Sequence, residues 1–191
     1  LWGYTLAFGE GGNAFIGSLS NFALNGVDTP EDQVFAIFQM MFVIITPALI
    51  TGALCERFKF KTYLVFLILW VTIVYAPIAH WVWASDGWLL KRGALDFAGG
   101  AVVHINAGMA AIAAAALVGR RRNIEQGIEP HNVPFVILGA SMLWFGWFGF
   151  NAGSGLAANG QAVSAFLVTN TAAATAMVVW VILGMDSWWK S

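Results

Sequence analysis

His104 is the residue whose type and position point most directly to chemistry. It lies near the middle of the apolar run Ala98–Val118, which Asp96 precedes and which Arg120, Arg121 and Arg122 follow. An ionisable side chain in the hydrocarbon region costs several kcal/mol, so such residues usually face a partner, a cavity or a conduction path. We therefore interpret His104 as a pore or proton-relay residue. The alternative is a core histidine that a neighbouring carbonyl or hydroxyl satisfies.

Asp96 stands eight residues before His104, at the start of the same run. Its carboxylate can accept hydrogen bonds from the exposed amides of the first helical turn, where the helix dipole also favours negative charge. A fixed negative charge near a pore mouth would in addition attract cations. On an ideal helix His104 is rotated only about 80° from Asp96, and Gly100 leaves space on that face.

Aromatic residues gather where the outer mouth of such a pore is expected. Phe38 and Phe42 are one helical turn apart, and Trp83 and Phe150 each end an apolar stretch. Any one of them alone is typical of the aromatic belt at a membrane interface. Together they could form a cage, because cation–π attraction contributes about 0.5–2 kcal/mol. Ser154 adds a hydroxyl that could accept a hydrogen bond from an N–H donor.

Other kinds of chemistry find little support in the sequence. It contains no Ser/His/Asp set, nucleotide-binding loop, metal-ligand cluster or redox cysteine pair. Cys55 is the only cysteine, and we expect it to pack near a helix end. His80 and His131 flank loops without ligand partners, which favours surface or interface roles over metal binding. No cofactor is expected, and an intramembrane enzyme is a weak alternative because a nucleophile or metal is lacking.

Composition sets the class of protein. The 191 residues are 59% hydrophobic and 10% charged, with a mean hydropathy of +0.74, whereas soluble domains are about 25% charged. A net charge of -1 offers no basic face for nucleic acid. The composition therefore predicts an integral membrane protein embedded in the lipid bilayer, and we expect a multi-pass protein of the plasma or inner membrane.

Five stretches are long enough to cross a hydrocarbon core of about 30 Å, which needs roughly 20 helical residues. Barrel strands would be about ten residues long with alternating polarity, so we expect an all-α helix bundle. The first eight residues read as the end of a further helix, and a chain that starts at Leu1 is expected to be part of a longer one. The expected spans are 34–54, 63–83, 98–118, 133–150 and 162–185.

The distribution of basic residues predicts the orientation of these spans, because basic residues concentrate in cytoplasmic loops. Under strict alternation only Lys91 and Arg92 face outward. The third span then enters from outside, with His104 about 12 Å of helix rise below Asp96. The basic residues on the predicted cytoplasmic side are Arg57, Lys59, Lys61, Arg120, Arg121, Arg122 and Lys190.

Several of these segments together resemble the ammonium transporter family (Amt/Mep/Rh), in its Amt branch. The string from Asp96 to His104, DFAGGAVVH, is similar to a signature of that family. Further segments agree in order, namely FQMMF at 38–42, GALCER at 52–57, PIAH at 77–80 and GWFGFNAGS at 146–154. The resemblance spans nearly the whole chain.

The resemblance implies a homotrimer of subunits with about eleven helices and one pore each. Residues 1–191 would form a single transmembrane domain, from the end of the second helix through the seventh. By motif position, Phe42, Trp83 and Ser154 match the outer ammonium-recruiting site, beside the carbonyl of Ala98 and with Phe38 in the mouth. Phe42 and Phe150 match a paired phenyl gate, His104 the first of two pore histidines, and Asp96 an acidic residue that supports the outer site.

The family's second pore histidine is expected on a later helix, outside these residues, and the interval between Trp83 and Asp96 is slightly longer than the family pattern. The resemblance implies ammonium or ammonia transport, with deprotonation at the gate. The alternative is an ammonium sensor that uses the same site to signal to a cytoplasmic partner, and transporters of this kind could also bind a cytoplasmic regulatory protein. A generic helical scaffold would leave the ordered motifs unexplained.

Overall fold

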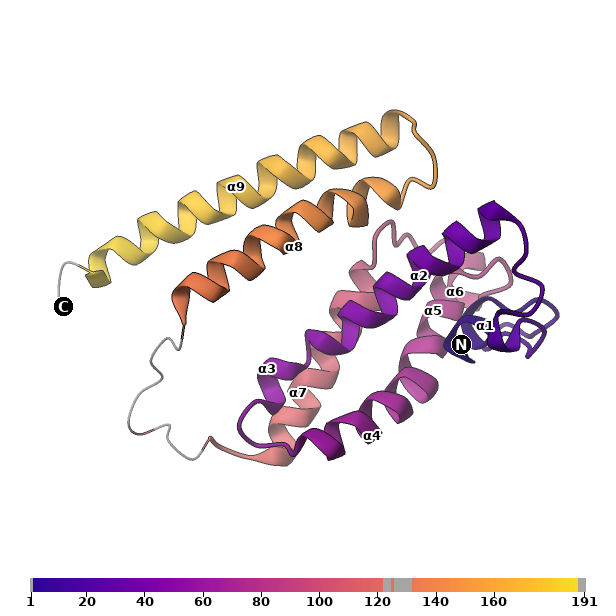
Figure 1. Ribbon diagram of the computed structural model, residues 1–191, viewed down its shortest axis with the longest axis horizontal. Helices are drawn as coiled ribbons and strands as arrows, with labels where there is room; N and C mark the ends of the chain where they lie inside the picture. The colour runs from indigo at the N-terminus through magenta and orange to yellow at the C-terminus, as the bar shows by residue number, and fades with distance from the viewer. Residues whose placement is uncertain (1, 122–124, 126–131, 189–191) are drawn as a thin grey trace. The chain divides into compact units, whose positions relative to one another are not determined.

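The computed structural model describes residues 2–121, 125 and 132–188, and every regular element among them is helical (Figure 1). The chain divides into two compact units, Leu1–Gly127 and Ile128–Ser191. Each unit is described by itself, so the assignment of residues 1–191 to one transmembrane domain stays a prediction. Arg122, His131 and Lys190 lie outside the described residues.

Five helices are long and apolar enough to cross a membrane, as the sequence predicts. The first and second spans begin four and three residues before the predicted apolar runs, the third begins two residues later, and the second ends eight residues later. At the first span, Thr29 and Pro30 start the helix before the hydrophobic residues begin. The five spans are Pro30–Leu54, Phe60–Lys91, Gly100–Val118, Val133–Gly153 and Gly160–Gly184.

The first unit opens with a short helix and a long loop over residues 9–29, termed the outer loop because the sequence predicts that it faces outward. Helix α1 (Trp2–Phe8) is helical as the sequence predicts and packs against the later helix α5 (Ala76–Trp83). The following loop contains the short 3-10 turn η1 (Phe22–Leu24), which also packs on α1.

Helix α2 (Pro30–Ala48) begins with a strong start signal. The hydroxyl of Thr29 accepts a hydrogen bond from the amide of Asp32 at 3.1 Å, and Pro30 occupies the first turn. Near the other end Pro47 lacks an amide hydrogen, and the helix soon gives way to the separate turn α3 (Thr51–Leu54). Cys55 follows α3 directly; it lies at a helix end as predicted, but it is exposed rather than packed.

The second span contains a continuous helix with a π-helical turn in its middle, followed by a turn and a short further helix. It consists of α4 (Phe60–Trp70), the π-helical η2 (Val71–Tyr75), α5, and the short α6 (Trp88–Lys91) after a turn. Pro77 lies in the first turn of α5 and cannot donate to a carbonyl in the preceding turn, which accounts for a widened turn at this point.

The third span begins with a second π-helical turn, η3 (Gly100–Ile105), and continues as α7 (Asn106–Val118). The η3 turn packs against α2 and α5, while α7 packs against α3. Two arginines connect the end of α7 to α3. Arg57 donates to the carbonyls of Ala53 and Gly119, and Arg121 donates to that of Gly52 at 3.0 Å. Two of the residues predicted to be cytoplasmic therefore meet at one end of the unit.

The second unit is a hairpin of α8 (Val133–Gly153) and α9 (Gly160–Trp188), which pack along each other. Asn132 starts α8 by accepting from the amide of Phe135 at 3.1 Å. Stacked rings of Phe148 and Phe166, with centroids 4.1 Å apart, hold the two helices together.

Gly87 offers a test of the turn that joins α5 to α6. A Cβ atom at this position would lie 2.2 Å from the carbonyl oxygen of His80 and 2.6 Å from that of Trp81. Gly87→Ala should therefore displace backbone and lower the stability of the full-length protein by about 1–3 kcal/mol, seen as a lower thermal unfolding midpoint in detergent. Gly52→Ala is the matched control, because a Cβ there meets nothing within 4 Å. Equal midpoints for the two variants would contradict this account.

Candidate functional site

Three of the predicted aromatic residues form one cluster in the first unit. The rings of Phe38 and Phe42 in α2 lie 4.9 Å apart at 83°, and those of Phe42 and Trp83 lie 5.2 Å apart at 73°. Both arrangements are edge-to-face, the geometry that aromatic quadrupoles favour. Phe42 is buried, whereas Phe38 and Trp83 are partly exposed. The end of the second span is thereby fixed against the first.

Trp83 also connects the second span to the start of the third. Its indole Nε1 donates a hydrogen bond to the backbone carbonyl of Asp96 at 3.0 Å. The slightly long interval between these residues therefore does not separate them. The residues between them form the short helix α6 and a loop that brings Asp96 back to Trp83.

The carboxylate of Asp96 organises the start of the third span. Its Oδ1 accepts from the amides of Gly99 and Gly100 at 2.6 and 2.8 Å, and its Oδ2 from those of Ala101 and Val102 at 2.8 and 2.9 Å. These are four successive amides at the start of the helix, which lack partners within it. The predicted capping role is confirmed, although Asp96 reaches the helix from three residues before the flanking Gly99.

Gly99 is needed where the chain turns beneath this carboxylate. Its φ of 93° lies in the left-handed region, and a Cβ atom would lie 2.6 Å from Cγ2 of Val103. The same Cβ would be 3.7 Å from Cδ1 of Phe42, so the turn passes directly beside the aromatic cluster. Ala98, whose carbonyl is a predicted part of the outer site, immediately precedes this glycine and is partly exposed.

His104 lies within the π-helical turn that follows. The carbonyl of Gly99 accepts from two amides, those of Val103 at 2.9 Å and His104 at 3.0 Å, which widens the turn. Val102 and Val103 are completely buried, whereas His104 is exposed in this unit. The sequence gives no signal for this turn, although π-helical turns are frequent at functional sites.

Phe150 and Ser154 lie together at the end of α8, in the second unit. The hydroxyl of Ser154 donates to the carbonyl of Phe150 at 2.7 Å, and the ring of Phe150 stacks on that of Trp147 with centroids 4.7 Å apart. Because the hydroxyl hydrogen is used inside the helix, the Ser154 oxygen can act toward other groups only as an acceptor. The pairing of Phe42 with Phe150 as a gate joins the two units and stays a prediction.

His80 departs from its predicted surface role. Its side chain is completely buried, with Nδ1 2.7 Å from the carbonyl oxygen of Ala7 and Nε2 2.7 Å from that of Asn13. The surface prediction is wrong because the outer loop folds back over α5, which a reading of hydropathy alone does not reveal. Within the described ranges, no group of three His, Cys, Asp or Glu side chains could hold a metal ion.

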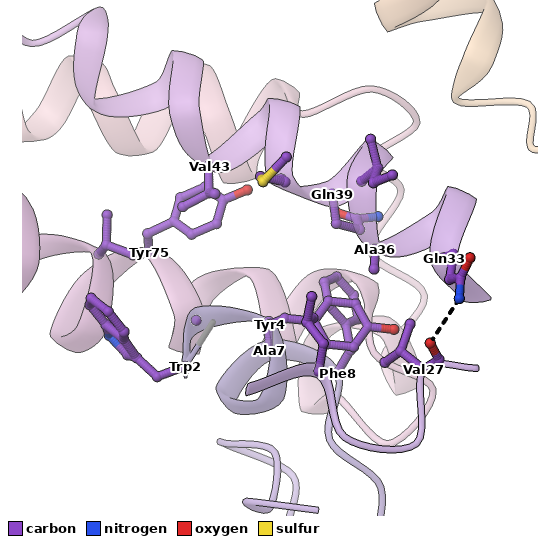
Figure 2. Close-up of a pocket in the computed structure, with 15 residues that line it drawn as sticks. Trp2, Tyr4, Ala7, Phe8, Val27, Gln33, Ala36, Gln39, Val43 and Tyr75 are labelled. Atoms are coloured by element: carbon purple, nitrogen blue, oxygen red, sulfur yellow. Dashed lines mark hydrogen bonds between the residues drawn. The ribbon is translucent and has the colours of Figure 1, made fainter. Parts of the chain in front are cut away.

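A largely apolar cavity of about 560 Å³ lies elsewhere in the first unit. Figure 2 shows Tyr4 and Phe8 of α1 facing Ala36 and Gln39 of α2 across it, with Tyr75 at one side. None of the predicted site residues lines this cavity. The candidate site is instead the aromatic cluster with the adjoining turn of Asp96 and His104.

Comparison with known proteins identifies the family. The model of the Ammonium Transporter Family matches residues 1–187. This chain belongs to the ammonium transporter family. It is 50% identical over 184 residues to the ammonium transporter Amt1 of Archaeoglobus fulgidus, an alignment that covers 96% of this chain and 46% of that protein. The chain therefore spans about half the length of the curated relatives it matches.

Solved structures agree with this assignment. The crystal structure of Mep2 from Candida albicans matches 97% of this chain and 44% of its own, with a TM-score of 0.89 and 40% identity. A structure described as a sensor Amt protein matches 96% of this chain and 49% of its own, with a TM-score of 0.83 and 37% identity. The predicted all-helical, multi-pass membrane fold is confirmed, and so is the assignment to a family of transporters rather than enzymes.

The Asp96 cap generates a prediction about stability. In Asp96→Asn only one side-chain oxygen remains to accept hydrogen bonds, and the new NH₂ group faces amides that are themselves donors. Three of the four hydrogen bonds are part-buried and the one from Gly100 is exposed. Because a fully buried donor without a partner costs about 1–3 kcal/mol, the thermal unfolding midpoint of the full-length protein should fall. The same change at the exposed Asp28 is the control and should leave the midpoint unchanged. An unchanged midpoint in Asp96→Asn would rule out the four-amide cap as a main support of the fold.

Proposed function

We propose that this chain is part of an ammonium transporter that recruits ammonium at its outer aromatic site and conducts it past His104. One observation carries the proposal above all: the Phe42–Trp83 pair is tied through Asp96 to the turn that contains His104. Membership of the family supports ammonium as the substrate. We further propose that the protein is a homotrimer.

Recruitment uses aromatic faces and a negative field. Trp83 is partly exposed and offers the indole surface that attracts cations most strongly. The indole donates to the backbone carbonyl of Asp96, and the carboxylate of the same residue adds a negative charge at the start of the third span. Ser154 supplies an oxygen that can accept a hydrogen bond from ammonium, which distinguishes this cation from metal ions of similar size.

Deprotonation follows from loss of water at the buried ring. Phe42 is only 2% exposed, so a cation that passes between it and Phe150 gives up its hydration. Desolvation disfavours the charged form and lowers the pKa of ammonium, which eases proton loss. Potassium has no proton to lose and no N–H to donate, so it is rejected at this step. Ammonia then moves along the apolar pore and exchanges hydrogen bonds with the ring of His104.

An ammonium sensor with the same site is the second candidate. It is favoured by the similarity to the sensor Amt protein, which covers the same part of the chain as the similarity to Mep2. Transport and sensing differ in whether ammonium crosses the membrane or its binding changes a cytoplasmic partner. Uptake measurements separate them directly, because a sensor without transport would not restore growth on ammonium.

Removal of the His104 ring tests conduction. In the full-length protein, His104→Ala should abolish selective uptake of labelled methylammonium by cells that lack their own ammonium transporters, and His104→Glu should abolish it or alter its selectivity. Because His104 is exposed in its unit while Val102 and Val103 are buried, both variants should still fold and assemble. Size-exclusion chromatography in detergent checks assembly. Unchanged uptake and selectivity in both variants would show that His104 does not take part in conduction.

Two substitutions of Trp83 isolate the contribution of its aromatic face. Trp83→Phe and Trp83→Leu both lose the N–H that donates to Asp96, but only the first keeps a ring. Because cation–π attraction contributes about 0.5–2 kcal/mol, the half-saturation concentration for methylammonium should be about 2- to 30-fold higher in Trp83→Leu than in Trp83→Phe. Equal values in the two variants would show that the aromatic face does not bind the substrate.

A further inference from the structure

The outer end of α5 contains a buried histidine whose two ring nitrogens both face acceptors. His80 is 0% exposed, and carbonyl oxygens of Ala7 and Asn13 lie 2.7 Å from Nδ1 and Nε2 respectively. A carbonyl oxygen can only accept a hydrogen bond. A neutral imidazole has one N–H and one lone pair, so it can satisfy only one of these contacts, whereas the doubly protonated ring satisfies both.

A carboxylate accompanies this ring. Oδ1 of Asp86, from the turn that follows α5, lies 3.5 Å from Nε2 of His80. A buried positive charge is costly unless an opposite charge and hydrogen bonds compensate it. Here α1 and the outer loop contribute carbonyl oxygens, and the turn after α5 contributes the carboxylate. All three of these groups are hydrogen-bond acceptors, and none can donate to a ring nitrogen.

We propose that His80 is a doubly protonated imidazolium that positions the outer site by fixing the outer loop and α1 onto α5. The part of this inference that concerns ammonium binding rests on the proposed function. The protonation state does not, because it follows from the contacts of the ring alone.

A tight turn in the outer loop presents three carbonyl oxygens to donors of the second span. The side-chain oxygen of Asn13 accepts from the amides of Phe15 and Ile16 at 2.8 and 3.3 Å, which closes a tight turn. Three successive carbonyls of the turn then accept from the second span. Asn13 accepts from the His80 ring at 2.7 Å, Ala14 from the amide of Trp88 at 3.1 Å, and Phe15 from Nε1 of Trp81 at 2.7 Å.

His80 is connected to the substrate site through the helix that carries it. Trp83 follows it by three residues at the end of α5, and the carbonyl of His80 accepts the amide of Ala84, which closes that last turn. The ring of His80 holds this turn to α1 and the outer loop, while the ring of Trp83 contacts Phe42 and Asp96. His80 is thus a positioning residue for Trp83.

The protonation state can be observed directly by solid-state NMR of full-length protein in lipid, with ¹⁵N-labelled histidine. We expect both ring nitrogens of His80 to show the chemical shifts of protonated nitrogens at pH 7, with couplings to directly bonded hydrogens. The signals are assigned by their loss in His80→Gln and by their displacement in Asp86→Asn. A non-protonated nitrogen in the His80 ring at pH 7 would overturn the proposal, whatever the protein transports.

Removal of the counter-charge gives a second signature. In Asp86→Asn the charged ring loses its carboxylate partner, so the ¹⁵N signal of Nε2 of His80 should move, while the signals of other histidines stay in place. Asp28→Asn, an equal loss of charge in an exposed part of the loop, should have no such effect. Identical ¹⁵N signals of the His80 ring in both variants would exclude Asp86 as its counter-ion.

The positioning role predicts a specific kinetic change. The amide group of His80→Gln can donate to only one of the two carbonyls, so the half-saturation concentration for methylammonium should rise about 2- to 12-fold, the range for one lost hydrogen bond, with little change in maximal rate. An unchanged half-saturation concentration in a correctly assembled variant would refute the positioning role. Absence of uptake by the unchanged protein would refute the proposed function instead, and the NMR result would stand independently.

Discussion

The start of the third span depends on a single carboxylate. Four successive amides at the N-terminus of a helix have no partner inside it, and in apolar surroundings each missing hydrogen bond is costly. Asp96 accepts from all four, and its own carbonyl accepts the indole N–H of Trp83. One residue therefore fixes the helix start and, with it, the end of the second span. The chain turns tightly under this carboxylate, and the turn needs a residue in the left-handed conformation. Glycine adopts that conformation without strain, which explains why Gly99 stands at this position.

The π-helical turn then sets the direction of His104. The carbonyl of Gly99 receives two amides, which widens the turn and changes the angular spacing of the residues that follow. Val102, Val103, Asn106 and Ala107 are buried in the first unit, whereas His104 is exposed between them. The residues that pack and the residue proposed to line the pore thus occupy different faces of one short segment. This separation allows the packed face to hold the turn rigidly while the imidazole stays accessible.

Hydropathy and residue type predict the five spans, the aromatic cluster and the capping role of Asp96, because each depends on composition or on a local rule. They do not predict the two π-helical turns, which arise from hydrogen-bond register rather than from apolar content. Nor do they predict the burial of His80, which depends on a loop that folds back from residues more than 60 positions earlier. Both histidines look alike as ionisable residues near apolar segments. Their surroundings separate them, since backbone carbonyls occupy both nitrogens of His80 while the ring of His104 is exposed in its unit.

The geometry of Asp96 also bears on how a cation can be held at the mouth. A carboxylate has about four acceptor positions, and in this protein four amides engage them. At the proposed recruitment site, a cation on the Trp83 face could not displace these amides without uncapping the helix, so it would feel the negative field of Asp96 but not direct coordination by it. Direct coordination would favour any small metal cation, whereas aromatic faces favour weakly hydrated ones. Occupying the carboxylate with backbone amides thus keeps the attraction and removes a site at which competing ions would bind.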